Sequence, residues 1–110
     1  MSYRIQRENA TTYSVVATNS ASTTPKIAFA TMSGGTIFVT AVSSATKVVW
    51  YASPDSQTTP VPLKDSTGSA VETTVSAGNA YALPDAVFGA LFISAVADAG
   101  TVTMHISTKG

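Results

Sequence analysis

Residues 101–107 read Thr-Val-Thr-Met-His-Ile-Ser, and this stretch decides the fold class. Val102, Met104 and Ile106 alternate with polar residues, so in an extended chain they share one face while the polar residues share the other. A strand of this kind packs one face on a core and leaves the other to water or to a partner, as antiparallel sheets do. The stretch therefore predicts a half-buried antiparallel strand near the end of the chain.

Further short strands are expected upstream, each bounded by turn-forming residues. Threonine and valine number 17 and 12 of the 110 residues, and both are stiff at the β-carbon and favour extended chain. The expected strands cover residues 13–17, 26–31, 36–42, 46–52, 59–63, 70–75, 91–97 and 101–107. Their spacing predicts an all-β antiparallel β-sandwich of seven to eight short strands, jelly-roll-like, with at most one helical turn near residues 84–88.

Several local features refine this prediction. Ser33-Gly34-Gly35 predicts a hairpin between the second and third strands, because glycine supplies the positive φ of tight turns. The third strand is apolar on both faces and is expected at the centre of a sheet. The last two strands are expected to pair through the turn at residues 98–100. Pro60 and Pro62 make residues 59–63 an edge segment, since proline cannot donate to a ladder.

The segment 84–97 leaves an alternative open. Pro84 lies near the first turn and Gly100 just past the end of a candidate helix that would place Val87 and Leu91 on one side. Gly89 lies in its middle and would cost a helix about 1 kcal/mol relative to alanine. We therefore expect one helical turn followed by a strand.

Composition excludes several classes of protein. A chain of 110 residues forms one domain, which we place at residues 13–110. Six basic and six acidic side chains give a net charge of zero, so bulk charge does not support nucleic-acid binding. No apolar run approaches the roughly 18 residues typical of a membrane-spanning helix, so no membrane partner is expected. The chain has no cysteine and begins without the apolar run of a signal peptide, which suits synthesis in a reducing cytoplasm.

The residues do not predict an enzyme. His105 is the only histidine and falls on the polar face of the last strand, without the nucleophile motif that would mark a hydrolase. Asp55, Asp65, Asp85 and Asp98 all lie in turn sequences, where aspartate caps its own backbone. One histidine and no cysteine leave no ligand set for a metal. We expect no catalytic residue, no metal and no cofactor.

Trp50 and Tyr51 are the best candidates for a ligand platform. Adjacent residues of a strand point to opposite faces, so at most one of the two is exposed. Trp50 shares its face with Val48 and Ala52 and is expected in the core. Tyr51 is then the exposed aromatic and a candidate interface residue. This pair keeps a carbohydrate-binding β-sandwich module, with surface glycans as ligand, as one alternative function.

The scarcity of charge suggests a surface that a partner covers. Charged residues make up 11% of the chain, whereas about 25% is typical of soluble domains. A core built mainly of valine and alanine buries little area, and small cores are often stabilised by association. We therefore expect a homo-oligomer. Residues 1–12 are interpreted as a docking arm whose contact residues are Tyr3, Arg4, Ile5 and Arg7, since arginine and tyrosine are favoured at interfaces. A solvated terminus and an ordinary first edge strand are the alternatives for this segment.

The C-terminal third resembles the end of small virion proteins from tailed bacteriophages, of the kind that decorate or cement the head. In such proteins a Leu-Pro-Asp-x-x-Phe-Gly-Ala-x-Phe stretch precedes two closing strands, the second of which begins Gly-Thr-Val. The matching positions here are Leu83, Pro84, Asp85, Phe88, Gly89, Ala90, Phe92, Gly100, Thr101 and Val102. Related sequences tend to carry a charge at the position of Leu91, so this apolar residue is a further candidate contact.

The resemblance implies a structural protein of the virion, made in the host cytoplasm and located on the capsid surface. It implies contacts with the major capsid protein and with further copies of the chain, as a homotrimer with three times the 11.2 kDa mass of one chain. A tail or fibre accessory protein of the virion is a second alternative. None of the matching positions implies an active site, because they are packing and turn residues.

Overall fold

The fold is described from a computed structural model, which covers residues 11–20, 26–28 and 34–109. Within these residues the chain forms nine strands and one 3-10 turn. The elements are β1 (Thr11–Ala17), β2 (Ile27–Ala28), β3 (Gly34–Ser43), β4 (Lys47–Ser53), β5 (Val61–Pro62), β6 (Glu72–Thr74), β7 (Asn79–Ala82), η1 (Asp85–Gly89), β8 (Phe92–Ala97) and β9 (Thr101–Lys109).

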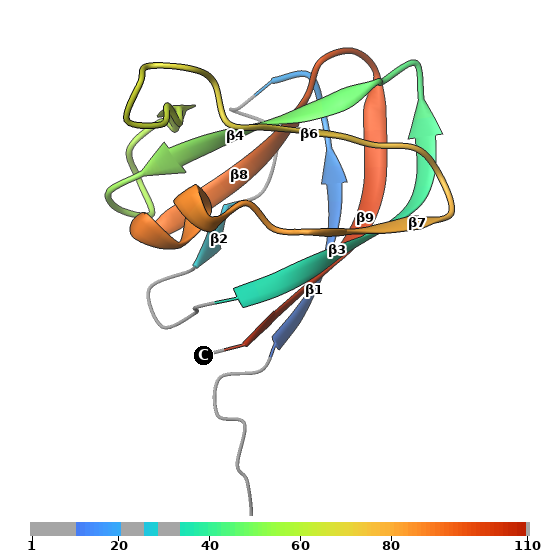
Figure 1. Cartoon of the computed structure of the whole chain (residues 1–110), viewed down its shortest axis with the longest axis horizontal. Helices are drawn as coiled ribbons and strands as arrows, with labels where there is room; N and C mark the ends of the chain where they lie inside the picture. The colour runs from blue at the N-terminus through green and yellow to red at the C-terminus, as the bar shows by residue number, and fades with distance from the viewer. Residues whose placement is uncertain (1–10, 21–25, 29–33, 110) are drawn as a thin grey trace, which may run out of the picture.

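The strands form two antiparallel sheets that pack face to face (Figure 1). Sheet A has the order β1-β9-β3-β7, and sheet B has the order β2-β8-β4-β5 with β6 also paired to β4. The chain changes sheet at nearly every connection, and only the path from β4 through β5 and β6 stays in one sheet. This alternation is jelly-roll-like, so the predicted fold class is confirmed.

The core lies between the two sheets and is centred on one tryptophan. Trp50 is fully buried, and its indole Nε1 donates a hydrogen bond of 3.0 Å to Thr73 Oγ1. This bond satisfies the one polar atom that burial would otherwise leave without a partner. The prediction that Trp50 belongs to the core is confirmed. The other fully buried large side chains are Ile27, Ile37, Ile93, Met104, Ile106, Val48, Val87 and Val102.

A single helical turn precedes β8, as the sequence predicted. Asp85–Gly89 forms a 3-10 turn that begins after Pro84, whose extended backbone precedes the turn. Val87 is fully buried and anchors the turn to the core. Ala90 has extended backbone, so the turn ends there and the chain continues into β8.

Two predicted hairpins are wrong, because the chain crosses between sheets at both points. β2 lies in sheet B and β3 in sheet A, so the glycines at 34 and 35 are part of β3. A β-carbon on Gly35 would collide with the Ser107 carbonyl oxygen and lie 2.7 Å from Leu83 Cδ1, so close packing explains that glycine. β8 and β9 likewise lie in different sheets, and Gly100, with φ of 58°, makes the crossing.

The strand that is buried on both faces is β8. β3 does lie inside its sheet, between β9 and β7, but Phe38 and Thr40 on its outer face are exposed. In β8 the outward-facing Ser94 and Val96 are buried as well as the inward-facing residues. β7 was not among the predicted strands, since its four residues follow directly on a turn sequence.

The edge strand beside β4 is interrupted by a loop. Leu63 donates its backbone N–H to the Trp50 carbonyl, and Trp50 donates its own N–H to the Val71 carbonyl, at 2.8 and 2.9 Å. The Val71 N–H also binds the Leu63 carbonyl at 3.1 Å, which closes the neck of the loop between them. β5 is exposed and only two residues long, so the prediction of an extended edge segment at 59–63 is confirmed.

Candidate interaction surfaces

The outer face of sheet A carries almost no charge. β1, β3 and β7 contain no acidic or basic residue, and β9 contains only His105 and its last residue, Lys109. Charged side chains normally cover the solvated faces of sheets and keep them apart. Sheet A is therefore a four-stranded sheet whose strands carry almost no charged side chain.

Two large apolar side chains are exposed on this face. Val16 is 48% exposed and Phe38 is 45% exposed. Phe38 lies opposite His105 in the β3–β9 ladder, and His105 lies opposite Ser14 in the β1–β9 ladder. The side chains of Ser14 and His105 meet across the strands, with Oγ and Nδ1 3.0 Å apart. The prediction that His105 is an exposed strand residue is confirmed.

A second apolar surface lies at the far end of sheet B. Val61 on β5 and Leu91 before β8 are 62% and 52% exposed, and they line one hollow of about 380 Å³. The remaining lining residues are Ala52, Ser53, Pro54, Gly89 and Ala90. The structure therefore places Leu91, a predicted contact residue, on an apolar surface that is separate from the outer face of sheet A.

Tyr51 lies on the outer face of sheet B and is half-buried. It faces Ser94 of β8 on one side and Pro62 of β5 on the other. Trp50 points away from it into the core, so the two aromatic residues do not form a joint platform. A saccharide could stack on Tyr51 alone, which weakens the alternative of a carbohydrate-binding module.

The predicted docking arm is mostly outside the described residues. Tyr3, Arg4, Ile5 and Arg7 all fall there. The described sandwich begins two residues before the predicted boundary, because β1 starts at Thr11 and Thr12 pairs with Ser107 of β9. Hydrogen bonding to β9 thus draws the end of the expected arm into the sandwich.

Two of the aspartates cap their own turns, as predicted. Asp55 Oδ1 accepts backbone N–H groups from Gln57 and Thr58 at 2.9 and 2.6 Å. Asp65 Oδ1 accepts from Thr67 Oγ1 at 2.6 Å and from backbone N–H groups around it. These hydrogen bonds favour the carboxylate and lower the pKa of both groups.

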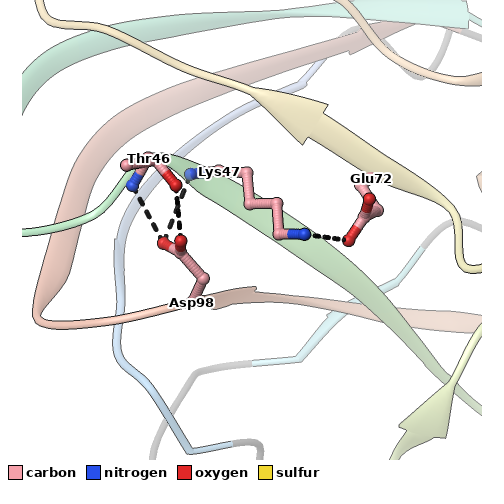
Figure 2. Close-up of polar contacts among 4 residues, drawn as sticks. All are labelled: Thr46, Lys47, Glu72 and Asp98. Carbon is pink, nitrogen blue, oxygen red and sulfur yellow. Dashed lines mark hydrogen bonds and ion pairs between the residues drawn. The ribbon is translucent and has the colours of Figure 1, made fainter.

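Asp98 performs a similar task between two strands (Figure 2). Thr46 donates its Oγ1–H to Oδ2 at 2.5 Å and its backbone N–H to Oδ1 at 2.9 Å. These bonds, with the Thr46 hydroxyl as the largest contribution, lower the pKa of Asp98 to about 2. The Asp98 carboxylate therefore holds the end of β8 against the start of β4.

An ion pair lies beside this carboxylate on sheet B. Lys47 Nζ and Glu72 Oε2 are 2.7 Å apart, and both side chains are more than a third exposed (Figure 2). The hydrogen bond to Glu72 raises the pKa of Lys47. An exposed pair of this kind adds little stability.

Comparison of the chain with protein-family models, with curated proteins and with solved structures finds no match. Across residues 11–20, 26–28 and 34–109 no helix has the length and hydropathy needed to cross a membrane. Sequence reasoning proposed Leu91 as a contact residue but named none of the other exposed apolar residues, Val16, Phe38 and Val61. The threonines at positions 36 and 40 could have revealed Phe38, since they share its face, opposite Ile37 and Val39.

Proposed function

We propose that this chain is a structural protein of a bacteriophage virion, which decorates and stabilises the capsid through contacts with its own copies and with the shell. The resemblance of the C-terminal third suggested this class of protein. The jelly-roll-like sandwich is compatible with it, since viral capsid domains use such folds, although the same fold serves many other functions.

One observation carries the proposal. The outer face of sheet A lacks charge yet exposes Val16 and Phe38, while charge is present on sheet B at Lys47 and Glu72. A face that works in water is normally charged, and an uncharged face with exposed apolar residues is typical of an interface. Stabilising a shell by this means needs contact area and no chemistry.

The second apolar surface fits a subunit that touches more than one neighbour. The hollow at Val61 and Leu91 lies on the other sheet, so both surfaces can be covered at once. We assign the outer face of sheet A to the shell and the hollow to a further neighbour. The resemblance implies three copies, with three times the 11.2 kDa mass of one chain.

Antibody labelling of purified phage particles tests the proposal. An antibody to this chain should decorate the heads, and Phe38→Lys should remove the chain from the particles without unfolding it. Gln57→Lys, an exposed loop change away from sheet A, is the matched control and should still bind. Labelling of tails would support the accessory-protein alternative instead, and particles that lack the chain would contradict both.

A further inference from the structure

We propose that β1 is a pairing edge for a second copy of this chain, with the two β1 strands antiparallel about a two-fold axis through Ser14. The inference concerns how two copies join. It replaces the trimer that the resemblance implies with a two-fold pair, and it does not require that the pair then binds a phage shell.

The edges of the two sheets differ in how well they are protected. Unpaired edge strands invite pairing with another chain, and proteins block them with proline, with charge or with short strands. The other three edge strands are protected by their short length, since β2 and β5 have two residues each and β7 has four. Proline adds to this at β5, which ends at Pro62 and follows the buried Pro60. β1 has seven residues, none of them charged or proline, and among the described residues it pairs with β9 alone.

The side chains of β1 leave this edge open. Thr12 Oγ1 lies 3.0 Å from Ser107 Oγ, and Ser14 Oγ lies 3.0 Å from His105 Nδ1. Both hydroxyl groups therefore turn toward β9 and away from the free edge. The outward backbone N–H and C=O groups of β1 then offer a row of donors and acceptors to which another extended chain can add.

The sequence of β1 is complementary to itself. In an antiparallel pair, two opposite residues either both point their N–H and C=O groups at the partner strand or both point them away. Because this direction alternates along β1, a two-fold axis must pass through a residue and not between two residues. An axis at Ser14 lets all seven residues pair. Thr12 then faces Val16 of the second copy, and Tyr13 faces Val15, which are favourable cross-strand pairs. No charge repels its symmetry mate, because β1 has none.

Pairing also enlarges the uncharged face. An axis perpendicular to the sheet joins the outer faces of two sheets A into one continuous face. Four strands of about seven residues cover roughly 400 Å², from about 4.8 Å between strands and about 3.3 Å per residue. A stable interface takes about 800 Å² from each partner, which two joined sheets supply and one does not.

Cysteine cross-linking tests the pairing directly, because the chain has no native cysteine. In Ser14→Cys the two thiols face each other across the axis, where opposite Cβ atoms lie about 5 Å apart. In the control Thr12→Cys the two thiols are four residues out of register, roughly 13 Å apart and too far to bond. Each variant loses one hydroxyl contact to β9, so the two are matched in stability.

Mild oxidation of the full chain should convert Ser14→Cys to a disulfide-linked dimer, with twice the 11.2 kDa mass of one chain, on a non-reducing gel. Thr12→Cys should give about tenfold less dimer, because its thiols exceed the reach of a disulfide. Equal cross-linking of both variants, or none of Ser14→Cys, would overturn the pairing.

Light scattering separates this inference from the proposed function. Ser14→Lys places two ammonium groups face to face and should shift the chain to monomer, whereas Thr40→Lys, on the same face but inside the sheet, should not. A stable trimer of the natural chain, at three times 11.2 kDa, would overturn the two-fold pair and leave the oligomer proposal intact. If the chain is a dimer in solution but its antibody never labels phage heads, the two-fold pair stands and the proposed function is contradicted.

Discussion

Sheets A and B share one core but differ in their outer faces. The strands of sheet A carry no charge except at His105 and Lys109, and their outer face exposes Val16 and Phe38. Sheet B carries the exposed Lys47–Glu72 pair, and its strand β8 buries even the outward-facing Ser94 and Val96 within the chain. The outer face of sheet B is thus covered in part by its own chain and carries a charged pair in water. The outer face of sheet A is instead suited to be covered by a partner.

The largest effect on stability should come from the core that the sheets share. Trp50→Ala removes a fully buried side chain and should lower the free energy of unfolding by about 3–5 kcal/mol. Phe38→Ala, the comparison on the outer face of sheet A, should cost less than about 1 kcal/mol, because Phe38 is already half in water. Urea denaturation followed by circular dichroism measures both, and equal losses would contradict the assigned faces.

Two adjacent glycines of β3 test how closely the neighbouring strands approach each other in sheet A. Gly35→Ala should cost about 1–3 kcal/mol, because its new methyl group would meet the Ser107 carbonyl and Leu83. Gly34→Ala meets nothing within 4 Å and should be neutral or stabilise the chain by up to about 1 kcal/mol. Thermal unfolding of the two variants gives the comparison. A tolerated alanine at position 35 would mean that the strands approach less closely.

One pair of valines compares the two outer faces directly. Val96 on sheet B is 6% exposed and Val16 on sheet A is 48% exposed. Val96→Ala should lower the free energy of unfolding by about 1.5 kcal/mol, from two lost buried carbons. Val16→Ala should change it by less than about 0.5 kcal/mol in the monomer. If denaturation shows the opposite order, sheet A is the face that the chain covers by itself.

The smallest effect concerns the carboxylate at the start of β4. The pKa of Asp98 is lowered to about 2 in the folded protein from an ordinary value of 3.8, so its contribution to stability is complete only above about pH 5. That contribution is lost as the pH falls from about 5 toward about 1, because the unfolded chain takes up the proton first.

The midpoint of thermal unfolding measures this difference. Natural chain and Asp98→Ala should differ at pH 6, and the difference should shrink as the pH falls through 2 toward about 1. A gap that stays constant from pH 6 to about pH 1 would show that Asp98 acts through packing and not through its charge.

The sequence predicted strand identity better than strand pairing. Alternating residues were enough to place Trp50 in the core and His105 outside, since alternation is a local property. A glycine can be required either by a positive φ or by a close neighbour that leaves no room for a β-carbon. The prediction assumed the first at Gly35, whereas the second applies, and the neighbours Leu83 and Ser107 are distant in sequence. The crossing at Gly100 was predicted as a hairpin, because a short turn can join two strands of one sheet or one strand from each sheet.

The candidate surfaces were only partly predictable. The shortage of charge in the whole chain predicted a covered surface, but its location on sheet A depends on which strands become neighbours. Val16 and Phe38 come from strands separated in sequence, and β9 brings them onto one face. Leu91 was proposed as a contact because the related sequences tend to carry a charge at its position. Val61 was not, since an edge valine between prolines carries no local signal of contact.

Oxidative footprinting of Phe38 tests most directly whether sheet A is the covered face. The free chain and purified phage particles that carry it are exposed to hydroxyl radicals, and modification is read by mass spectrometry. Tyr51 on the outer face of sheet B is the internal control. We expect modification of Phe38 to fall several-fold on the particles while that of Tyr51 changes little. Equal modification of Phe38 in both samples would contradict the account.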